Sequence, residues 1–126
     1  MNCIFCKIVS GEIPAYTIYE DEMVLAFLDI SPDTDGHTLI IPKKHYLDLG
    51  EIDNDTLIHI MSVARDISKL LEEKLNSKGT VLVQNNGIVQ EVKHYHLHIK
   101  PVYDKDKYHE KNKVSDVKEV FDRIMK

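Results

Sequence analysis

The chain has 126 residues, of which 43% are hydrophobic and 29% are charged, and its formal net charge at pH 7 is -5. This length suits one domain with a single core, which we expect over residues 1–126, with the core in about 2–101 and a charged linker and helix in 102–126. The acidic balance argues against a nucleic-acid binder, because such a protein would be expected to carry a basic patch. The chain opens with no basic segment before an apolar run, and no stretch reaches about 18 apolar residues, so we expect neither export nor membrane insertion and a cytoplasmic protein.

Cys3 and Cys6 are the two cysteines of the chain and have the spacing C-x-x-C. In a reducing compartment this spacing indicates zinc or redox chemistry more than a structural disulfide, and two exposed thiols are the alternative. A thioredoxin-like role fits poorly, because the motif begins the chain instead of following a strand of a βαβ unit. Zinc would need two more ligands, for which His45, at the end of a predicted strand, and His94, at the start of another, are the natural candidates.

Alternating and β-branched residues predict short strands on both sides of one long helix. The expected strands are Thr17–Glu20, Met23–Leu28, His37–Pro42, Thr80–Gln84 and a histidine-bearing strand that ends at Pro101. The helix is expected over Thr56–Leu75, where apolar residues recur at threes and fours. Its predicted buried stripe consists of Leu57, Ile60, Met61, Ala64, Ile67, Leu71 and Leu75.

Polar residues and glycine mark the ends of these elements. Asp53 or Asp55 can cap the start of the long helix, and Gly79 lies just past its end. A short helical turn is expected at Phe5–Val9, and a terminal helix resumes near Val114 with Ser115 as a possible cap. Elements in this order predict an α+β fold, in which an antiparallel meander of about five strands is covered by one long helix and carries short terminal helices.

The segment Gln90–Pro101 carries three of the seven histidines at alternate positions. Successive side chains of a β-strand point to opposite faces, so His94, His96 and His98 would share one face at spacings of about 7 Å. A neutral imidazole can be a metal ligand or a nucleophile near pH 7. Three histidines on one face therefore favour a metal-binding or catalytic role over the alternative of an ordinary half-exposed strand. The opposite face would point into apolar packing through Tyr95, Leu97 and Ile99.

The sequence His94-Tyr95-His96-Leu97-His98-Ile99 resembles the signature of the histidine triad family of nucleotide hydrolases and transferases, in which histidines alternate with hydrophobic residues. The resemblance covers about Asn2 to Pro101, and its further matching segments are Cys3–Ile8, Gly11–Pro14, Ala26–Pro32 and Gly36–His45. It implies that His45 and His94 complete a zinc site with the two cysteines. It also implies a homodimer formed through the long helix and a sheet edge.

The resemblance further implies a mechanism and a nucleotide site. His96 would attack the α-phosphorus and form a nucleotidyl-histidine intermediate, which water then resolves. His98 would hydrogen-bond a phosphate oxygen and stabilise charge in the transition state, and Asp29 would accept both ribose hydroxyls. The residues that would hold a purine, each of which is ordinary core in the alternative interpretation, are Ile4, Phe5, Ile8, Phe27 and Ile30.

Two features depart from the family pattern. Relatives usually have a longer connection between the Asn-x-Gly turn and the following glutamine, so the loop from Asn85 to Gln90 is expected to be tighter. These two side chains, with backbone amides near Glu91 and Val92, would supply donors to a phosphate. Lys100 also replaces the last hydrophobic residue of the signature, which we interpret as a minor change.

Together these features predict a nucleotide-binding hydrolase that cleaves a nucleoside monophosphate, AMP, from a phosphoramidate or a dinucleoside polyphosphate. The alternative is a non-catalytic, zinc-stabilised module that binds nucleotides or partners. A metalloenzyme with all three strand histidines on one ion ranks last, because it leaves the cysteines unexplained. Among the other histidines, we expect His37 to be structural, His59 to lie at the surface and His109 to be exposed in the charged linker.

Overall fold

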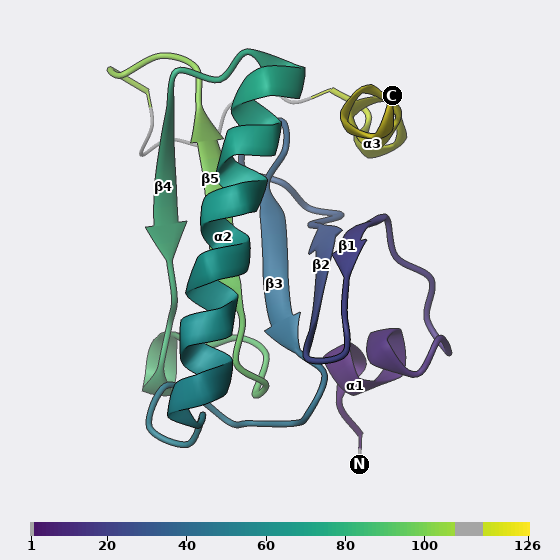
Figure 1. Ribbon diagram of the computed structural model, residues 1–126, viewed down its shortest axis with the longest axis vertical. Coiled ribbons are helices and arrows are strands. Elements are labelled where there is room, and N and C mark those ends of the chain that lie inside the picture. Colours follow the sequence, from purple (N-terminus) through teal and green to yellow (C-terminus); the bar gives the residue numbers. More distant parts are fainter. Residues whose placement is uncertain (1, 108–114) are drawn as a thin grey trace.

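The computed structural model describes residues 2–107 and 115–126, and a five-stranded sheet forms its centre (Figure 1). Every neighbouring pair in the order β1-β2-β3-β5-β4 is antiparallel. The first three strands form a meander, but helix α2 (Asn54–Leu75) then carries the chain to the sheet edge, so β5 returns between β3 and β4. The expected α+β fold is confirmed, with this crossover in place of a continuous meander. The strands are β1 (Thr17–Glu20), β2 (Val24–Leu28), β3 (Thr38–Pro42), β4 (Gly79–Val83) and β5 (Leu97–Val102).

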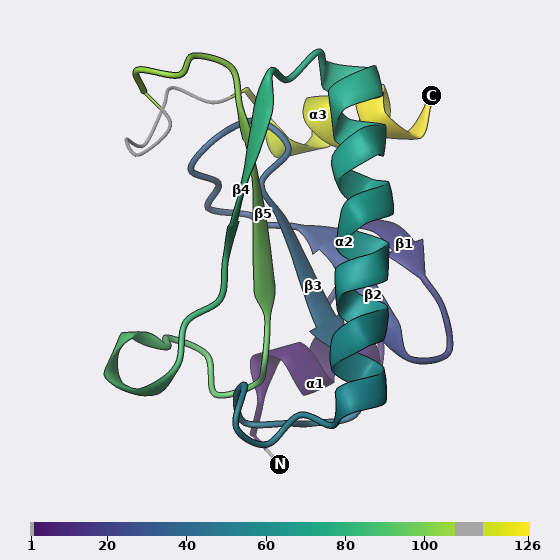
Figure 2. The ribbon, with the colours of Figure 1, turned by 60° about the vertical axis from the view of Figure 1, so that its left-hand side comes forward.

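Helix α2 covers one face of the sheet and packs on β3 and β5 (Figure 2). Asp53 caps it by accepting a hydrogen bond from the Thr56 amide at 3.0 Å, so the helix begins at Asn54, before the predicted start. No helix among the described residues, α2 included, combines the length and apolar character needed to cross a bilayer. The side chains that α2 buries are Thr56, Ile60, Val63, Ala64, Ile67, Leu71 and Leu75.

Two details of the predicted helix are wrong. Met61 was placed in the buried stripe but is 45% exposed. Asn76, not Gly79, ends the helix, and its φ of 59° lies in the left-handed region, which asparagine tolerates better than most side chains. Gly79 instead begins β4, the edge strand.

The other face of the sheet packs against α1 (Ile4–Val9). Phe5 of this helix is buried among side chains of β2 and β3, including Phe27, whose ring centroid lies 5.7 Å away. The loops that follow β2 and β4 lie on the side away from α2 (Figure 2). One face therefore holds the main core, and the other carries a short helix and two loops that can enclose a site.

The histidine segment is a strand only in its second half. The ladder between β3 and β5 begins at Leu97, opposite Ile40, so His94 and His96 precede the strand. β5 also continues through Pro101, which was expected to end it. The ladder with β3 has already stopped there, so the missing N–H of the proline costs no hydrogen bond on that side. As predicted, the core shared with α2 contains Tyr95, Leu97 and Ile99.

Helix α3 (Val117–Met125) packs beside α2 and β1. Asp116 caps it by accepting a hydrogen bond from the Lys118 amide at 2.8 Å. The prediction that Ser115 is the cap is therefore wrong, because Ser115 bonds a distant loop instead. The predicted helix start at Val114 and the histidine at 109 lie outside the described residues.

His59 ties α2 to the turn between β1 and β2. Its Nε2 lies 2.6 Å from the Oδ2 of Asp21, a carboxylate that also accepts hydrogen bonds from the Tyr19 hydroxyl and from the amides of Met23 and Val24. Burial by itself raises the pKa of Asp21, but these hydrogen bonds outweigh it and hold the pKa well below its ordinary value. His59 thus lies near the surface, as expected, with a structural partner.

Candidate active site

The four predicted zinc ligands lie together, although they come from three separate parts of the chain. Cys3 and Cys6 belong to the start of α1, whereas His45 follows β3 and His94 precedes β5. The Sγ of Cys3 lies 3.5 Å from the Nδ1 of His94. The Sγ of Cys6 lies 3.3 Å from the Nδ1 of His45 and 3.6 Å from that of His94. All four ligand atoms lie within 4.8 Å of one another.

A hydrogen bond at the Nε2 of His94 leaves its Nδ1 free to bind a metal. Its Nε2 lies 2.8 Å from the carbonyl oxygen of Pro42. A carbonyl only accepts, so Nε2 carries the proton and Nδ1 turns a lone pair toward the thiols. Burial lowers the pKa of His94, which favours this neutral form. Two thiolates and two neutral imidazoles suit tetrahedral zinc, whose bond lengths place neighbouring ligand atoms about 3.5 Å apart. The residues present fit zinc.

Beside this cluster lies a cleft of about 470 Å³, a size typical of small-ligand sites. Its residues come from α1, from the loop between β2 and β3, from the loop between β4 and β5, and from the sheet. The residues predicted to act on a nucleotide that line it are Ile4, Phe5, Asp29, Asn85, His96 and His98.

His96 offers an unprotonated nitrogen to this cleft. Its Nδ1 lies 2.9 Å from the carbonyl oxygen of His94, so Nδ1 carries the proton and the lone pair belongs to Nε2. The side chain is 5% exposed, and its ring stands edge-on to Phe5 at a centroid distance of 5.0 Å. The side chain of His94 thus belongs to the cluster with Cys3, Cys6 and His45, while its carbonyl orients His96 in the cleft.

His37 and His98 form a hydrogen-bonded relay. The backbone amide of Asp33 donates to the Nδ1 of His37 at 3.1 Å, so neutral His37 carries its proton on Nε2. That Nε2 lies 2.9 Å from the Nδ1 of His98, which must accept the hydrogen bond. His98 therefore keeps its own proton on Nε2. This is the donor that a phosphate oxygen would need.

Both rings of the relay are neutral near pH 7. Burial is the main cause that lowers the pKa of His98 to about 3, and neighbouring His96, His37 and Lys100 contribute to the same shift. Burial also lowers the pKa of His37, against the opposing charge of Asp29. Neutrality matters because a protonated His98 could not accept the hydrogen bond from His37.

Asp29, His37 and His98 also bring three possible ligand atoms within 4.8 Å of one another. A metal on the Nε2 of His37 would displace its proton to Nδ1, where the amide of Asp33 already donates. We therefore interpret the group as a relay and not as a second metal site. The hypothesis of one ion on all three strand histidines also fails, because both nitrogens of His94 face other partners.

The structure leaves several predicted nucleotide residues outside the cleft lining. Ile8 and Phe27 pack behind Phe5 in the core of that face, and Ile30 is 78% exposed. Leu39, which received no role from the sequence, lines the cleft instead. The apolar wall is therefore built partly from residues other than those predicted.

Gln90 anchors the loop between β4 and β5 and does not line the cleft. It is 4% exposed, and its side-chain amide donates to the Leu47 carbonyl at 2.7 Å. Lys93 closes the same loop by donating to the carbonyls of Gly87 and Gln90 at 3.0 and 2.9 Å, around the short helix η1 (Gly87–Val89). These bonds hold the loop at the edge of the cleft.

Two cleft residues escaped sequence reasoning. His37 was expected to be structural, yet it lines the cleft and contacts His98. Lys100, treated as a minor change, points to the same side as His98 by strand alternation, and its Nζ lies 2.9 Å from the Oδ2 of Asp33. The alternation that located the histidines could have located Lys100, but nothing in the local sequence reveals a partner for His37.

Known proteins resemble this chain over most of its length. A family model described as the HIT domain matches residues 10–105. An uncharacterised HIT-like protein of Methanocaldococcus jannaschii is 48% identical over 98% of this chain and 96% of that protein. A Candida albicans protein named adenosine 5'-monophosphoramidase is 40% identical over 82% of this chain and 72% of that protein. The crystal structure of a zinc-bound histidine triad family protein from Mycobacterium smegmatis has a TM-score of 0.89 and 39% identity, covering 98% of this chain and 91% of that chain.

Proposed function

Because this chain belongs to the HIT family, we propose that it is a hydrolase that releases AMP from a phosphoramidate or a dinucleoside polyphosphate through a nucleotidyl-His96 intermediate. The observation that carries the proposal is the hydrogen bond between the Nδ1 of His96 and the His94 carbonyl at 2.9 Å. It leaves the lone pair of Nε2 in a cleft of about 470 Å³. The name of the C. albicans relative supports a phosphoramidate as substrate.

The reaction would proceed in two displacements. The Nε2 of His96 attacks the α-phosphorus, the bond from phosphorus to the leaving group breaks, and the leaving group departs with the electron pair and gains a proton from water. Water then attacks the phosphorus of the nucleotidyl-histidine, loses a proton, and releases AMP with His96 restored. The Nε2–H of His98 would donate to a phosphate oxygen throughout, where it stabilises the charge of both transition states.

Asp29 and the apolar wall would bind the nucleoside. The side chain of Asp29 is 21% exposed, and its Oδ1 already accepts the Ser31 amide at 2.8 Å. A carboxylate has further acceptor capacity, which the ribose hydroxyls can use. Ile4 and Phe5 would contact the base, since they line the same cleft.

Zinc would be held by Cys3, Cys6, His45 and His94 and would have a structural role. When bound, a structural zinc supplies folding free energy directly. The short helix α1 has only six residues, too few to be stable without tertiary contacts, and it carries Phe5 between its two cysteines. The cluster would thus fix both the base-contacting helix and the carbonyl that orients His96.

The test is AMP release from an adenosine phosphoramidate and from a diadenosine polyphosphate, followed by chromatography. Wild-type protein should release AMP from at least one of them. A His59→Asn variant serves as a control, because His59 does not line the cleft and pairs with Asp21. Nucleotide binding without any AMP release would favour the alternative of a non-catalytic module.

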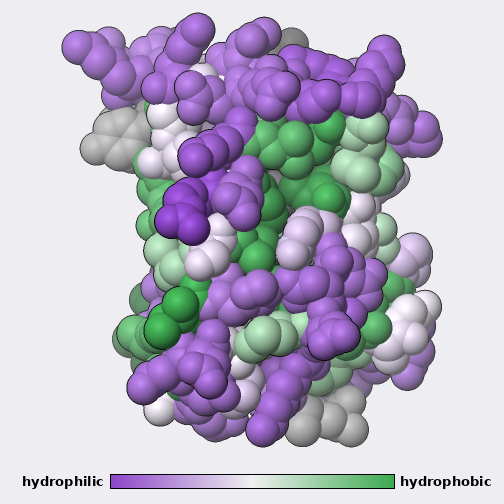
Figure 3. Space-filling model, viewed as in Figure 1, coloured by the Kyte–Doolittle hydropathy of each residue, from purple (hydrophilic) through white to green (hydrophobic). Residues whose placement is uncertain are grey.

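We also propose a homodimer formed through α2 and the β4 edge. Large apolar side chains are exposed on both elements, with Ile58 at 65%, Met61 at 45% and Leu82 at 42%. Figure 3, which looks onto α2 and β4, shows hydrophobic surface between the hydrophilic side chains. Pairing would cover this surface and an otherwise open strand edge. Light scattering at micromolar concentration should give twice the 14.6 kDa chain mass, and particles of single mass would contradict the proposal.

A further inference from the structure

The loop between β2 and β3, residues 29–37, carries three groups on which the cleft depends. Asp29 begins the loop and lines the cleft, His37 ends it and contacts His98, and the Asp33 amide between them fixes the tautomer of His37. The Asp29 amide closes the loop by donating to the His37 carbonyl at 2.9 Å. A shift of this loop would therefore disturb the ribose contact and the relay together.

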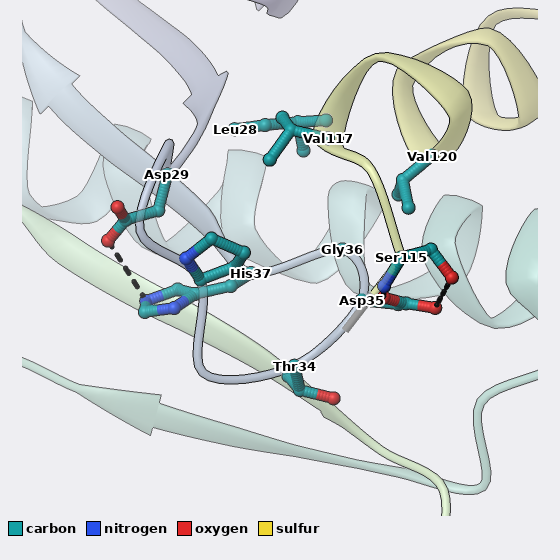
Figure 4. A pocket seen from close by; sticks show the side chains of 10 residues that line it. Leu28, Asp29, Thr34, Asp35, Gly36, His37, Ser115, Val117 and Val120 are labelled. Atoms are coloured by element: carbon teal, nitrogen blue, oxygen red, sulfur yellow. Dashed lines mark hydrogen bonds and ion pairs between the residues drawn. The ribbon is translucent and has the colours of Figure 1, made fainter. Parts of the chain in front are cut away.

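The C-terminal segment contacts this loop at Asp35, as Figure 4 shows. The Asp35 carboxylate accepts two hydrogen bonds from Ser115, one from its amide at 2.8 Å and one from its hydroxyl at 3.0 Å. The Tyr103 hydroxyl donates to the carbonyl of Asp35 at 2.8 Å. Three hydrogen bonds from distant parts of the chain thus converge on one residue of the loop.

Packing limits the loop on its other sides. Leu28, Val117 and Val120 face a cavity of only about 10 Å³ between the loop and α3 (Figure 4). Gly36 has a φ of +87°, and a Cβ added there would lie 2.7 Å from the Cδ1 of Leu75. The end of the loop at Gly36 therefore has little space in which to shift while the C-terminal segment stays in place.

We infer that the segment beginning at Ser115 is a positioning element of the cleft, and that Asp35 and Ser115 are positioning residues for Asp29 and for the His37–His98 relay. The inference rests on the proposed function for the ribose contact, whereas the relay is a property of the structure alone. The HIT-domain match ends at residue 105, so Ser115 and α3 lie beyond the segment that the family model describes. The cleft would thus depend on a part of the chain outside the matched domain.

The first test compares the binding of AMP and 2′-deoxy-AMP by calorimetry in Asp35→Ala, Ser115→Ala and Asp35→Asn. We expect Asp35→Ala to weaken AMP roughly threefold to tenfold and to remove most of the preference for the ribonucleotide, because a misplaced Asp29 loses its hydroxyl contact. Ser115→Ala should have a smaller effect, since its amide still donates. Asp35→Asn should restore part of the preference, because its side-chain oxygen can still accept one hydrogen bond.

The second test uses ¹⁵N chemical shifts of the imidazole rings, which report the tautomer of each histidine. In the wild type, His37 and His98 should both carry the proton on Nε2. In Asp35→Ala, His37 should show a mixture of the Nδ1–H and Nε2–H tautomers. The matched control is Asp122→Ala, which removes an exposed ion pair with Lys118 within α3 and should change neither readout.

An unchanged ribonucleotide preference and unchanged tautomers in Asp35→Ala, with only a lower melting temperature, would overturn the inference and leave a packing role. Failure of the proposed function looks different: wild-type protein would bind neither nucleotide. In that case the tautomer comparison between wild type and Asp35→Ala still decides whether the segment positions the relay.

Discussion

The cluster of Cys3, Cys6, His45 and His94 and the neighbouring cleft use histidines of one segment in opposite ways. In the cluster, His94 donates from Nε2 to the Pro42 carbonyl and turns Nδ1 toward two thiols. In the cleft, His96 donates from Nδ1 to the His94 carbonyl and leaves Nε2 unprotonated. The residue type is the same in both regions. The backbone acceptor of one ring nitrogen determines what the other nitrogen can do.

The two regions also differ in their access to solvent and in their partners. His94 is 0% exposed, which suits a ligand that contributes to folding. His98, by contrast, is only partly buried and sits in an open cleft, where its relay partner His37 comes from another strand end. If this contrast is correct, variants in the cleft should lose turnover and keep zinc, whereas variants in the cluster should lose zinc.

The largest expected effect is the loss of turnover in His96→Asn. Removal of a covalent nucleophile should lower kcat by roughly three orders of magnitude or more. Zinc content and melting temperature should remain close to wild type, since His96 provides no zinc ligand. Metal analysis and AMP release on the same preparation give both values, with His59→Asn as the control. A His96→Asn protein without zinc would contradict the separation of the two regions.

The next effect is the loss of zinc in Cys3→Ser and in His94→Asn. Each change should abolish stoichiometric zinc and lower the unfolding free energy by about 3 kcal/mol, because metal binding contributes to folding. Thermal unfolding with and without a chelator measures this directly, and the chelator should destabilise the wild type but not the variants. If His94→Asn retained zinc while His96→Asn lost it, the assignment of roles along the segment would be reversed.

How well the sequence predicted these regions depended on the distance between partners along the chain. Periodicity placed α2 and the sheet strands, and alternation placed Tyr95, Leu97 and Ile99 in the core, because these patterns reflect neighbours within one element. Predicted strand ends and the resemblance to a known family both grouped the cysteines with His45 and His94, which lie far apart in sequence.

The failures concern contacts that no local pattern encodes. His37 reaches His98 across 61 residues, and Ser115 reaches Asp35 across 80, so neither contact was predicted. Gln90 was expected at a phosphate, but its side-chain amide donates to the Leu47 carbonyl, 43 residues earlier in the chain. Such contacts depend on how loops pack onto the finished sheet.

A smaller effect is the pH dependence of the unfolding free energy that His98 of the cleft should cause. The folded-state pKa of His98 is about 3, below an unfolded value of about 6.5. Below pH 6.5 the unfolded chain binds a proton that the folded chain excludes, so stability falls as pH falls from about 6.5 toward 3. This group alone should cost about 2 kcal/mol at pH 5. Denaturant unfolding at pH 7 and pH 5 measures it, and His98→Asn should lose that part of the pH dependence while zinc remains bound. An identical pH dependence in the variant would contradict the lowered pKa.

The smallest effect concerns the sugar. Asp29 is proposed to accept the ribose hydroxyls, so 2′-deoxy-AMP should bind about 1 to 2 kcal/mol more weakly than AMP, or roughly fivefold to thirtyfold in Kd. Asp29→Ala should weaken AMP by a similar amount and bind the two nucleotides equally, because the acceptor is gone. Asp33→Ala is a useful comparison, since it removes a different carboxylate of the same cleft while its backbone amide still donates to His37. A wild type that binds both nucleotides with equal affinity would remove Asp29 from sugar recognition, although the His96 chemistry would be unaffected.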